Sequence, residues 1–373
     1  MHISSKLLLT FTNNMFDIYH FKPNEKDMEL LTYKGIVYKK NTTDILIPPF
    51  YFKEEYIYNT DKYNNWLSTV DISSSTFFYA MEGSVVRVFY YHDSWHVLTH
   101  KKNAFESKWS CPFTFGELFI NGIEDEYYYN NKFKSYVDTN NIQYIEDDPF
   151  NLFLNILDKE KVHYFIVRNI KENRVYCEPP VLLSKIVSIG SVPLYSKKLV
   201  LSNPIVTMCH NEPIKCNDTI TLNHIFTNLS IHDYFGIIVL DSSGNYIKIT
   251  HDTYQVYKNI RGSHSNIIKR YYEIRHNKHL VNLFLKMYPE LFLKVEKIER
   301  SVLRICDKIF SLYKNKYIFN KPVHIPFQYI SILNDIHLIY KTKKKKINMH
   351  QVILCWNKLK PYIQEKNIKM NSN

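Results

Sequence analysis

The chain has 373 residues, of which 45% are hydrophobic, so it is long enough to bury a sizeable core and to form two domains. Its 48 Lys and Arg against 36 Asp and Glu give a formal charge of +12, which favours a polyanionic partner such as nucleic acid. With only 8 glycines and no GxGxxG or P-loop pattern, a glycine-built phosphate loop is excluded. The six cysteines form no CxxC pair, and Cys209-His210 with Cys216 is too loosely spaced for a structural zinc site, so we expect buried reduced thiols.

No apolar stretch in the sequence reaches about 18 residues, which excludes a membrane-spanning helix. Residues 1–11 include a short apolar patch but have neither a charged flank nor a cleavage site of small residues, so they do not resemble a secretory signal. We therefore expect an intracellular protein of the cytoplasm, with the cytoplasm of a host cell or a virion as its possible locations.

The first predicted elements are two strands at residues 34–38 and 45–50, joined by a polar turn at 41–44. The second strand runs into Pro48 and Pro49, which cannot donate hydrogen bonds to a central ladder. The pattern predicts a short antiparallel pair that ends at the prolines.

The strongest strand signal lies in residues 77–99. Residues 84–90 are rich in β-branched and aromatic side chains, 92–94 are short and polar, and 95–99 return as a second strand. Glu82 and Gly83 precede the first strand. The stretch predicts a β-hairpin with a carboxylate and a glycine at its head.

A helix and a further strand follow this hairpin. Thr114, with Glu117 three residues later, predicts a capped helix start. Apolar residues at helical spacing predict a second helix near 149–160, and 162–168 form a strong strand pattern.

The remaining strands of the first domain are expected between residues 180 and 250. Short apolar runs separated by Pro, Asn and Ser predict strands across 180–230. Residues 234–241 and 246–250 flank the turn Ser242-Ser243-Gly244-Asn245, which predicts a second hairpin.

From residue 265 onward the apolar residues recur at three- and four-residue spacing, which is typical of helices. A loop is expected around Pro322 and Pro326, with helices at 328–340 and 349–364 after it. The break near 255–262 predicts a first domain at 1–255 and an all-helical domain at 256–373.

The head of the first hairpin resembles the first motif of the phage-type ATP-dependent RNA ligases, Lys-x-Asp/Glu-Gly-Ser. Glu82-Gly83-Ser84 match the end of this motif. Further short matches follow in the same order as in the family and cover most of residues 30–262: Pro49-Phe50, Lys53, Asn173-Arg174-Val175, Gly236 and Lys248. The resemblance implies an α+β fold, with an antiparallel-sheet nucleotidyltransferase domain, ATP-grasp-like, ahead of the helical domain.

Three chemical positions of the family differ in this chain. The lysine that accepts the nucleotide is replaced by Ala80, and two carboxylates are replaced by Ile166 and Phe235. Alanine cannot attack the α-phosphate of ATP, and hydrocarbon cannot ligate Mg²⁺. The sequence therefore predicts no catalytic nucleophile and no metal ligands, with ATP and Mg²⁺ bound only where the ancestral site still works.

Five positions that the family uses for nucleotide binding are kept, and the resemblance implies cofactor contacts for them. They are Glu82, Gly83, Arg87, Gly236 and Lys248. Two of them have a structural alternative, since Glu82 could cap a turn and Arg87 could pair with a surface carboxylate. Lys248 is expected to contact phosphate from the strand face that lines the cleft.

A basic run lies between two predicted helices of the second domain. It contains Lys343, Lys344, Lys345 and Lys346, which we identify as candidates for binding the nucleic-acid backbone. A solvated loop is the alternative.

Three functions remain open at this point. The first is an RNA-ligase-like protein without lysine adenylylation that binds RNA, another nucleic acid or a protein. The second is an active ligase with a displaced nucleophile such as Lys34 or Lys101, and the third is a structural or assembly protein. The abundance of Asn, Ile, Lys and Tyr indicates an A+T-rich genome, which is common among large DNA viruses and some parasites.

Overall fold

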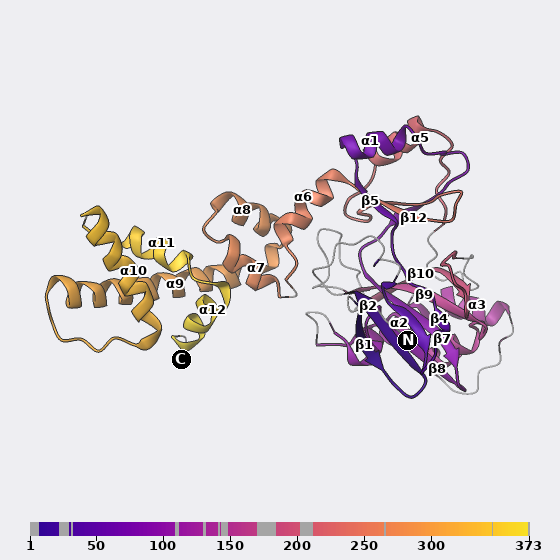
Figure 1. Cartoon of the computed structure of the whole chain (residues 1–373), viewed down its shortest axis with the longest axis horizontal. Coiled ribbons are helices and arrows are strands. Elements are labelled where there is room, and N and C mark those ends of the chain that lie inside the picture. Colours follow the sequence, from indigo (N-terminus) through magenta and orange to yellow (C-terminus); the bar gives the residue numbers. More distant parts are fainter. Residues whose placement is uncertain are drawn as a thin grey trace. The chain divides into compact units, whose positions relative to one another are not determined.

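The computed structural model describes residues 7–21, 30, 33–108, 112–129, 132–140, 142, 148–169, 184–201, 212–264, 266–344 and 346–371. The chain divides into two units, Met1–Lys258 and Asn259–Asn373, each shown in Figure 1. The division falls inside helix α6 (Asp252–Arg261), a few residues after the predicted boundary. The first unit combines sheets and helices and the second is helical in its described residues, so the predicted α+β class is confirmed.

The described part of the first unit contains three four-stranded sheets. The first sheet is an antiparallel meander in chain order, and its strands β3 and β4 are the pair predicted before the prolines. Its members are β1 (Leu7–Thr12), β2 (Phe16–Phe21), β3 (Ile36–Lys39) and β4 (Ile45–Ile47).

The second sheet has the strand order β10-β9-β7-β8 and is antiparallel throughout. Its strands are β7 (Ser84–Tyr91), β8 (Ser94–Leu98), β9 (Lys161–Asn169) and β10 (Ser184–Pro193). The predicted hairpin is confirmed as β7 and β8. Its turn residues His92 and Asp93 both have positive φ, 47° and 57°, as a two-residue hairpin turn requires.

The third sheet has the order β5-β12-β11-β6. Its strands are β5 (Glu54–Ile57), β6 (Thr76–Ala80), β11 (Gly236–Leu240) and β12 (Tyr246–Thr250). The second predicted hairpin is confirmed as β11 and β12, but β5 pairs with β12 in parallel, which departs from an all-antiparallel expectation. Because β6 lies in this sheet and β7 in the second, residues 81–83 carry the chain from one sheet to the other.

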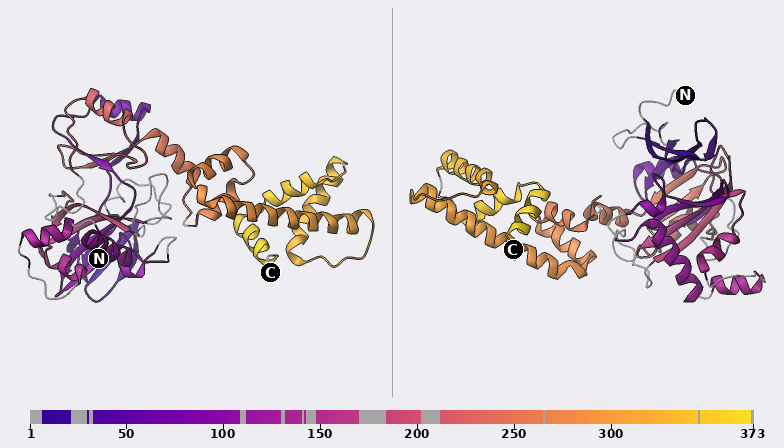
Figure 2. Two further views of the ribbon diagram at one scale, coloured as in Figure 1. Left: turned by 180° about the vertical axis from the view of Figure 1, so that it is seen from behind. Right: turned by 90° about the horizontal axis from the view of Figure 1, so that it is seen from below.

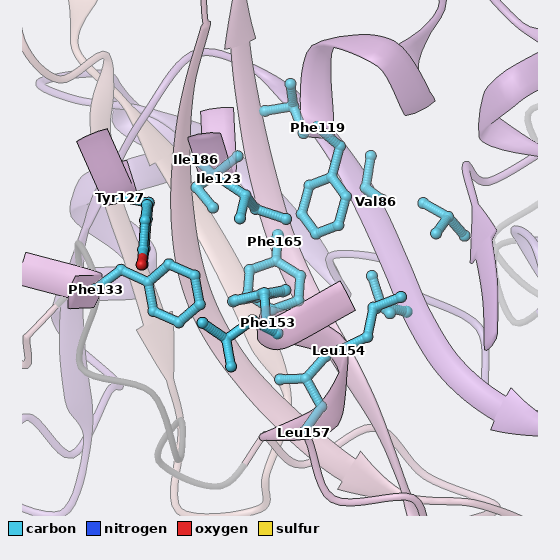
Figure 3. Close-up of a cluster of buried hydrophobic side chains, with 14 of the residues drawn as sticks. Val86, Phe119, Ile123, Tyr127, Phe133, Phe153, Leu154, Leu157, Phe165 and Ile186 are labelled. Atoms are coloured by element: carbon cyan, nitrogen blue, oxygen red, sulfur yellow. The ribbon is translucent and has the colours of Figure 1, made fainter. Parts of the chain in front are cut away.

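Helices cover one face of the second sheet. The predicted helix start at Thr114 is confirmed, with a capping box to Glu117 at the beginning of α2 (Phe115–Tyr128). Helices α3 (Lys132–Thr139) and α4 (Pro149–Asn155) complete this layer. Figure 3 shows its core, where the rings of Phe119 and Phe153 lie 5.2 and 5.6 Å from that of Phe165 on β9.

The third sheet is covered by helix α1 (Asp61–Leu67) and helix α5 (Thr219–Thr227). Helix α5 overturns the prediction of strands throughout 180–230. Asp218 caps its start by accepting a hydrogen bond from the Thr221 backbone N–H at 2.6 Å, and Leu222 and Phe226 bury its apolar face.

The described second unit consists of helices that were predicted from their apolar spacing. They are α7 (Ile267–Ile274), α8 (Lys278–Met287), α9 (Phe292–Tyr313), α10 (Phe327–Lys343), α11 (Met349–Asn357) and α12 (Pro361–Met370). The single helix predicted at 349–364 is divided in two, because Pro361 begins a new helix at a position that proline favours. Within the described ranges, no helix combines the length and the hydropathy needed to cross a bilayer.

Candidate functional site

A cavity of about 920 Å³ lies between the second and third sheets of the first unit. Each of these sheets contributes lining residues from three of its strands. They are Val85, Ile166 and Ile189 from the second sheet, and Phe78, Ile238 and Lys248 from the third. A volume of this size is typical of small-molecule sites.

The segment that crosses between the two sheets forms part of the cavity wall. Met81, Glu82 and Gly83 all line the cavity, and Glu82 is only 7% exposed. Gly83 has φ +151°, and a Cβ there would lie 2.3 Å from Cγ2 of Ile166. Glycine is therefore required at this position by both its backbone conformation and the close approach of β9.

Apolar side chains occupy the three positions that the ligase motifs assign to the lysine nucleophile and to two carboxylates. Ala80 ends β6, is fully buried, and its carbonyl accepts a hydrogen bond from the Phe235 N–H at 2.8 Å. Ile166 and Phe235 line the cavity, and the Phe235 ring lies 5.3 Å from that of Tyr254. Among the described residues, no group of three or more His, Cys, Asp or Glu side chains is placed to hold a metal ion.

Lys248 projects from β12 into the cavity wall. Its ammonium lies 2.7 Å from the Glu55 carboxylate and 5.0 Å from the centre of the Phe52 ring. Burial lowers the pKa of Lys248, the nearby Lys258 lowers it further, and Glu55 partly offsets both. The result is a desolvated ammonium whose partner carboxylate is itself half exposed, an arrangement suited to exchanging one anion for another.

Further lysines surround Lys248. Among the residues that the structure describes, two carboxylates, Glu82 and Glu106, and six lysines line the cavity: Lys34, Lys101, Lys102, Lys108, Lys248 and Lys258. Burial lowers the pKa of Lys34, and the charges of Lys248 and Lys101 lower it further, so these ammonium groups are near enough to repel one another. The excess of positive charge favours a ligand with several negative charges.

Arg87, predicted as a cofactor contact, does not line the cavity. Its side chain is fully buried, and its guanidinium donates hydrogen bonds to the carbonyls of Gly35 and Thr99, the latter at 2.6 Å. Burial lowers the pKa of Arg87 to about 10. It joins the turn before β3 to the end of β8 and thereby supports the wall that contains His100, whose pKa burial and Arg87 hold well below its usual value.

Gly236, also predicted as a contact, lies outside the cavity lining. It pairs with Ala80 and Thr250 across the third sheet, and a Cβ at Gly236 would lie 2.0 Å from the Ile249 carbonyl oxygen. Its role is to let β12 approach closely. Of the predicted contacts, Glu82, Gly83 and Lys248 are brought together and Arg87 and Gly236 are not.

The predicted basic run lies in the second unit. Lys344 and Lys346 are exposed at the end of α10, whereas Lys345 and the side chain of Lys343 lie outside the described residues. The matched segment Asn173-Arg174-Val175 also lies outside them.

Several cavity residues escaped the sequence reasoning. Lys108, Lys258 and Tyr254 line the cavity but were not among the predicted site residues. Glu55, which pairs with Lys248 without itself lining the cavity, was not predicted either. Lys258 and Tyr254 lie four residues apart on α6 and therefore on the same face of this helix. That spacing is the local signal from which their common location could have been predicted.

Comparison of the sequence with protein-family models finds no match. The sequence is similar to two viral proteins that are each named "Immediate-early protein ICP-46 homolog". It is 22% identical to that of invertebrate iridescent virus 3, covering 77% of this chain and 61% of the relative, and 23% identical to that of invertebrate iridescent virus 6, covering 64% and 52%. The chain thus spans little more than half the length of these relatives.

The fold is similar to solved structures of an archaeal ATP-dependent RNA ligase. One form shares 12% identity at a TM-score of 0.43, over 76% of this chain and 73% of the ligase. A second form shares 9% identity at a TM-score of 0.41, over 79% and 76%.

Proposed function

We propose that this chain is an RNA-ligase-like protein that does not adenylylate a lysine and that uses its lysine-lined cavity to bind the phosphates of a nucleic acid. The observation that carries the proposal is the contrast within one cavity. Ile166 and Phe235, which replace two ligase carboxylates, line the cavity together with several lysines, whereas Ala80, which replaces the ligase lysine, is buried at the end of β6 and is not part of the lining.

Adenylylation requires an amine in line with the α-phosphate of ATP and oxygen ligands for a divalent metal. Ala80 supplies no amine, and its side chain is enclosed at the end of β6. Ile166 and Phe235 present carbon where the ligase motifs have carboxylates. Together these differences leave the site without the nucleophile and the Mg²⁺ ligands that the ligase motifs supply.

Phosphate binding requires less than catalysis does. The described residues that line the cavity include four more lysines than carboxylates, an excess that concentrates anions. A partly desolvated ammonium such as that of Lys248 makes strong charge-assisted hydrogen bonds. Aromatic side chains from Phe52, Phe235 and Tyr254 offer flat surfaces beside these charges. The combination fits a phosphate ester attached to a planar base.

The experiment is incubation of the full chain with α-³²P-ATP and Mg²⁺, followed by denaturing electrophoresis next to an active ATP-dependent ligase. We expect no labelled band from this chain. In parallel, a fluorescent RNA oligonucleotide at low salt should bind, and Lys34→Met with Lys248→Met should weaken that binding about tenfold or more. A covalently labelled band would contradict the proposal.

The second candidate is an active ligase with a displaced nucleophile. It is favoured by the presence of Lys34 and Lys101 in the cavity lining. It predicts labelling that disappears in Lys34→Ala or Lys101→Ala. If neither labelling nor RNA binding occurs at low salt, a structural or assembly role takes precedence.

A further inference from the structure

The end of helix α9 in the second unit carries an unusual arrangement of aromatic and basic residues. Helix α9 continues into a π-helix at Lys314–Ile318, and residues 319–326 then return along the unit without helix (Figure 2). As a result α10 runs beside α9 in the same direction: Lys308 stands 5.9 Å from the Tyr329 ring, and further along, Tyr313 lies 6.3 Å from His337. The lysine-rich end of α10 therefore lies beside the π-helix.

Three flat side chains form a stack at this end. The Tyr317 and His337 rings are 4.0 Å apart and inclined by 16°, and the His337 and Tyr340 rings are 6.0 Å apart and inclined by 22°. His337 and Tyr340 are three residues apart on α10, which places them on one helix face. Tyr340 is 47% exposed, so the last ring of the stack is accessible to a further planar group.

The two segments that carry the stack are rich in positive charge. Residues 313–321 and 337–346 together contain eight lysines and neither Asp nor Glu. The ammonium of Lys316 lies 5.0 Å from the centre of the Tyr317 ring, and Lys341 follows Tyr340 directly. Partial burial lowers the pKa of His337, and the charges of Lys341 and Lys316 lower it further, which places both lysines close to the stack.

We infer that this aromatic–lysine tip, made of Tyr317, His337, Tyr340, Lys316 and Lys341, binds single-stranded nucleic acid. A base stacks on the accessible Tyr340 ring and the lysines contact the flanking phosphates. Stacking on an aromatic side chain needs an unpaired base, because the faces of paired bases are covered by their neighbours. The tip lies wholly within the second unit, so it does not depend on what the cavity of the first unit binds.

The alternative ligand of an aromatic and basic surface is an anionic membrane, and Ile318 and Phe319 beside the stack are exposed. The parallel rings favour the nucleic acid, since base stacking uses a flat face whereas membrane insertion needs only apolar area. The experiment separates the two.

The test is fluorescence anisotropy of the full chain with 12-nucleotide single-stranded RNA and DNA at 50 mM salt, with saturating ATP present to occupy any nucleotide site. Tyr340→Ala should weaken binding at least about fivefold, the lower end of what one stacked base contributes. Tyr340→Phe should restore it. Tyr362→Ala, which removes an exposed tyrosine from α12 of the same unit, is the matched control and should change nothing.

Salt dependence tests the lysines separately. Lys316→Ala with Lys341→Ala should reduce the magnitude of the slope of log K against log salt by about 1.4, since each phosphate contact to a single strand contributes about 0.7. Lys294→Ala with Lys297→Ala, exposed lysines nearer the start of α9, should leave the slope unchanged. Equal losses for Tyr340→Ala and Tyr362→Ala, or binding to phosphatidylserine vesicles without oligonucleotide binding, would overturn the inference.

Discussion

Lys248 is the cavity residue whose charge environment leads most directly to a testable prediction. Its ammonium is largely buried and lies near Lys258, which together lower its pKa below the usual 10.5, while the ion pair with Glu55 partly offsets this shift. A bound phosphate stabilises the protonated form, so binding and protonation of Lys248 support one another.

We therefore expect the affinity for a fluorescent ATP analogue to fall as the pH rises through the lowered pKa of Lys248, and so at a pH below 10.5. Lys248→Met should bind about tenfold more weakly at pH 7.5 and should lack this step. Lys197→Met, at an exposed lysine outside the cavity lining, should keep both the affinity and the step. An unchanged pH profile in Lys248→Met would show that Lys248 does not contact the ligand.

Gly83 makes a prediction about stability. Gly83→Ala should lower the free energy of unfolding by about 2–4 kcal/mol, because it combines a strained φ of +151° with overlap against Ile166. Gly244→Ala is a suitable control, since Gly244 also has a positive φ, +73°, but the atom nearest its Cβ is the flexible end of Lys198. It should cost about 1 kcal/mol. Urea unfolding measures both, and equal losses would contradict the packing argument.

Among the helices and strands, those with a clear local sequence signal were predicted correctly. The two hairpins followed from turn residues between β-branched runs, and the capping box at Thr114 and Glu117 followed from side chains three positions apart. Helix α5 was missed because its residues 219–221, Thr-Ile-Thr, favour strands, and the cap supplied by Asp218 was overlooked.

The position of Arg87 could not be derived from its strand alone. Alternation along β7 correctly places Arg87 on the same side as Val85, which lines the cavity. What covers Arg87 comes from elsewhere in the chain, namely the carbonyls of Gly35 and Thr99. Likewise, sequence spacing does not reveal that Lys34 and Lys108 meet at one cavity, because tertiary packing brings them together.

A polar cluster of Arg275, Glu299 and Tyr271 joins helices α7 and α9 of the second unit, and its contribution to stability can be measured. Arg275 is 4% exposed at its side chain and donates two hydrogen bonds of 2.8 Å to Glu299, which also accepts from Tyr271. Arg275→Ala should destabilise the unit by about 3 kcal/mol, because it leaves a partly buried carboxylate without its cation. Arg300→Ala, which breaks an exposed pair with Glu296, should cost about 0.5 kcal/mol or less in the same urea titration.

On the scale of the whole molecule, the division within α6 has a consequence for fragments. Arg270 of the second unit donates hydrogen bonds of 2.9 Å to the carbonyls of Asn259 and Ile260 at the end of α6. A fragment of residues 252–371 keeps these acceptors, and a fragment of residues 263–371 loses them. We expect the shorter fragment to melt roughly 5–10 °C lower by circular dichroism, and Arg270→Ala in the longer fragment to reproduce the loss. Identical melting temperatures would show that α6 does not stabilise the second unit.

The viral relatives agree with one of the two sources that the amino-acid composition suggested, large DNA viruses and some parasites. The ordered matches to ligase motifs, Glu82-Gly83-Ser84, Gly236 and Lys248, concern the backbone and one cation, and only Glu82, Gly83, Ser84 and Lys248 lie in the cavity lining. The sequence therefore predicted the backbone positions of the cavity wall better than the lysines that line it. A glycine is required at a position by backbone geometry, whereas the lysines of a cavity have no fixed spacing in the sequence.

Because Lys248 is paired with Glu55, an anion that binds Lys248 must compete with the Glu55 carboxylate. A carboxylate held beside the ammonium behaves like an inhibitor at high effective concentration. A ligand therefore gains binding free energy from Lys248 only to the extent that its anion binds the ammonium more strongly than the Glu55 carboxylate does. Small monovalent anions gain little by this exchange, whereas a chain of phosphates that reaches several lysines at once gains from each of them. Under the proposed function, this ion pair therefore favours ligands that carry several negative charges.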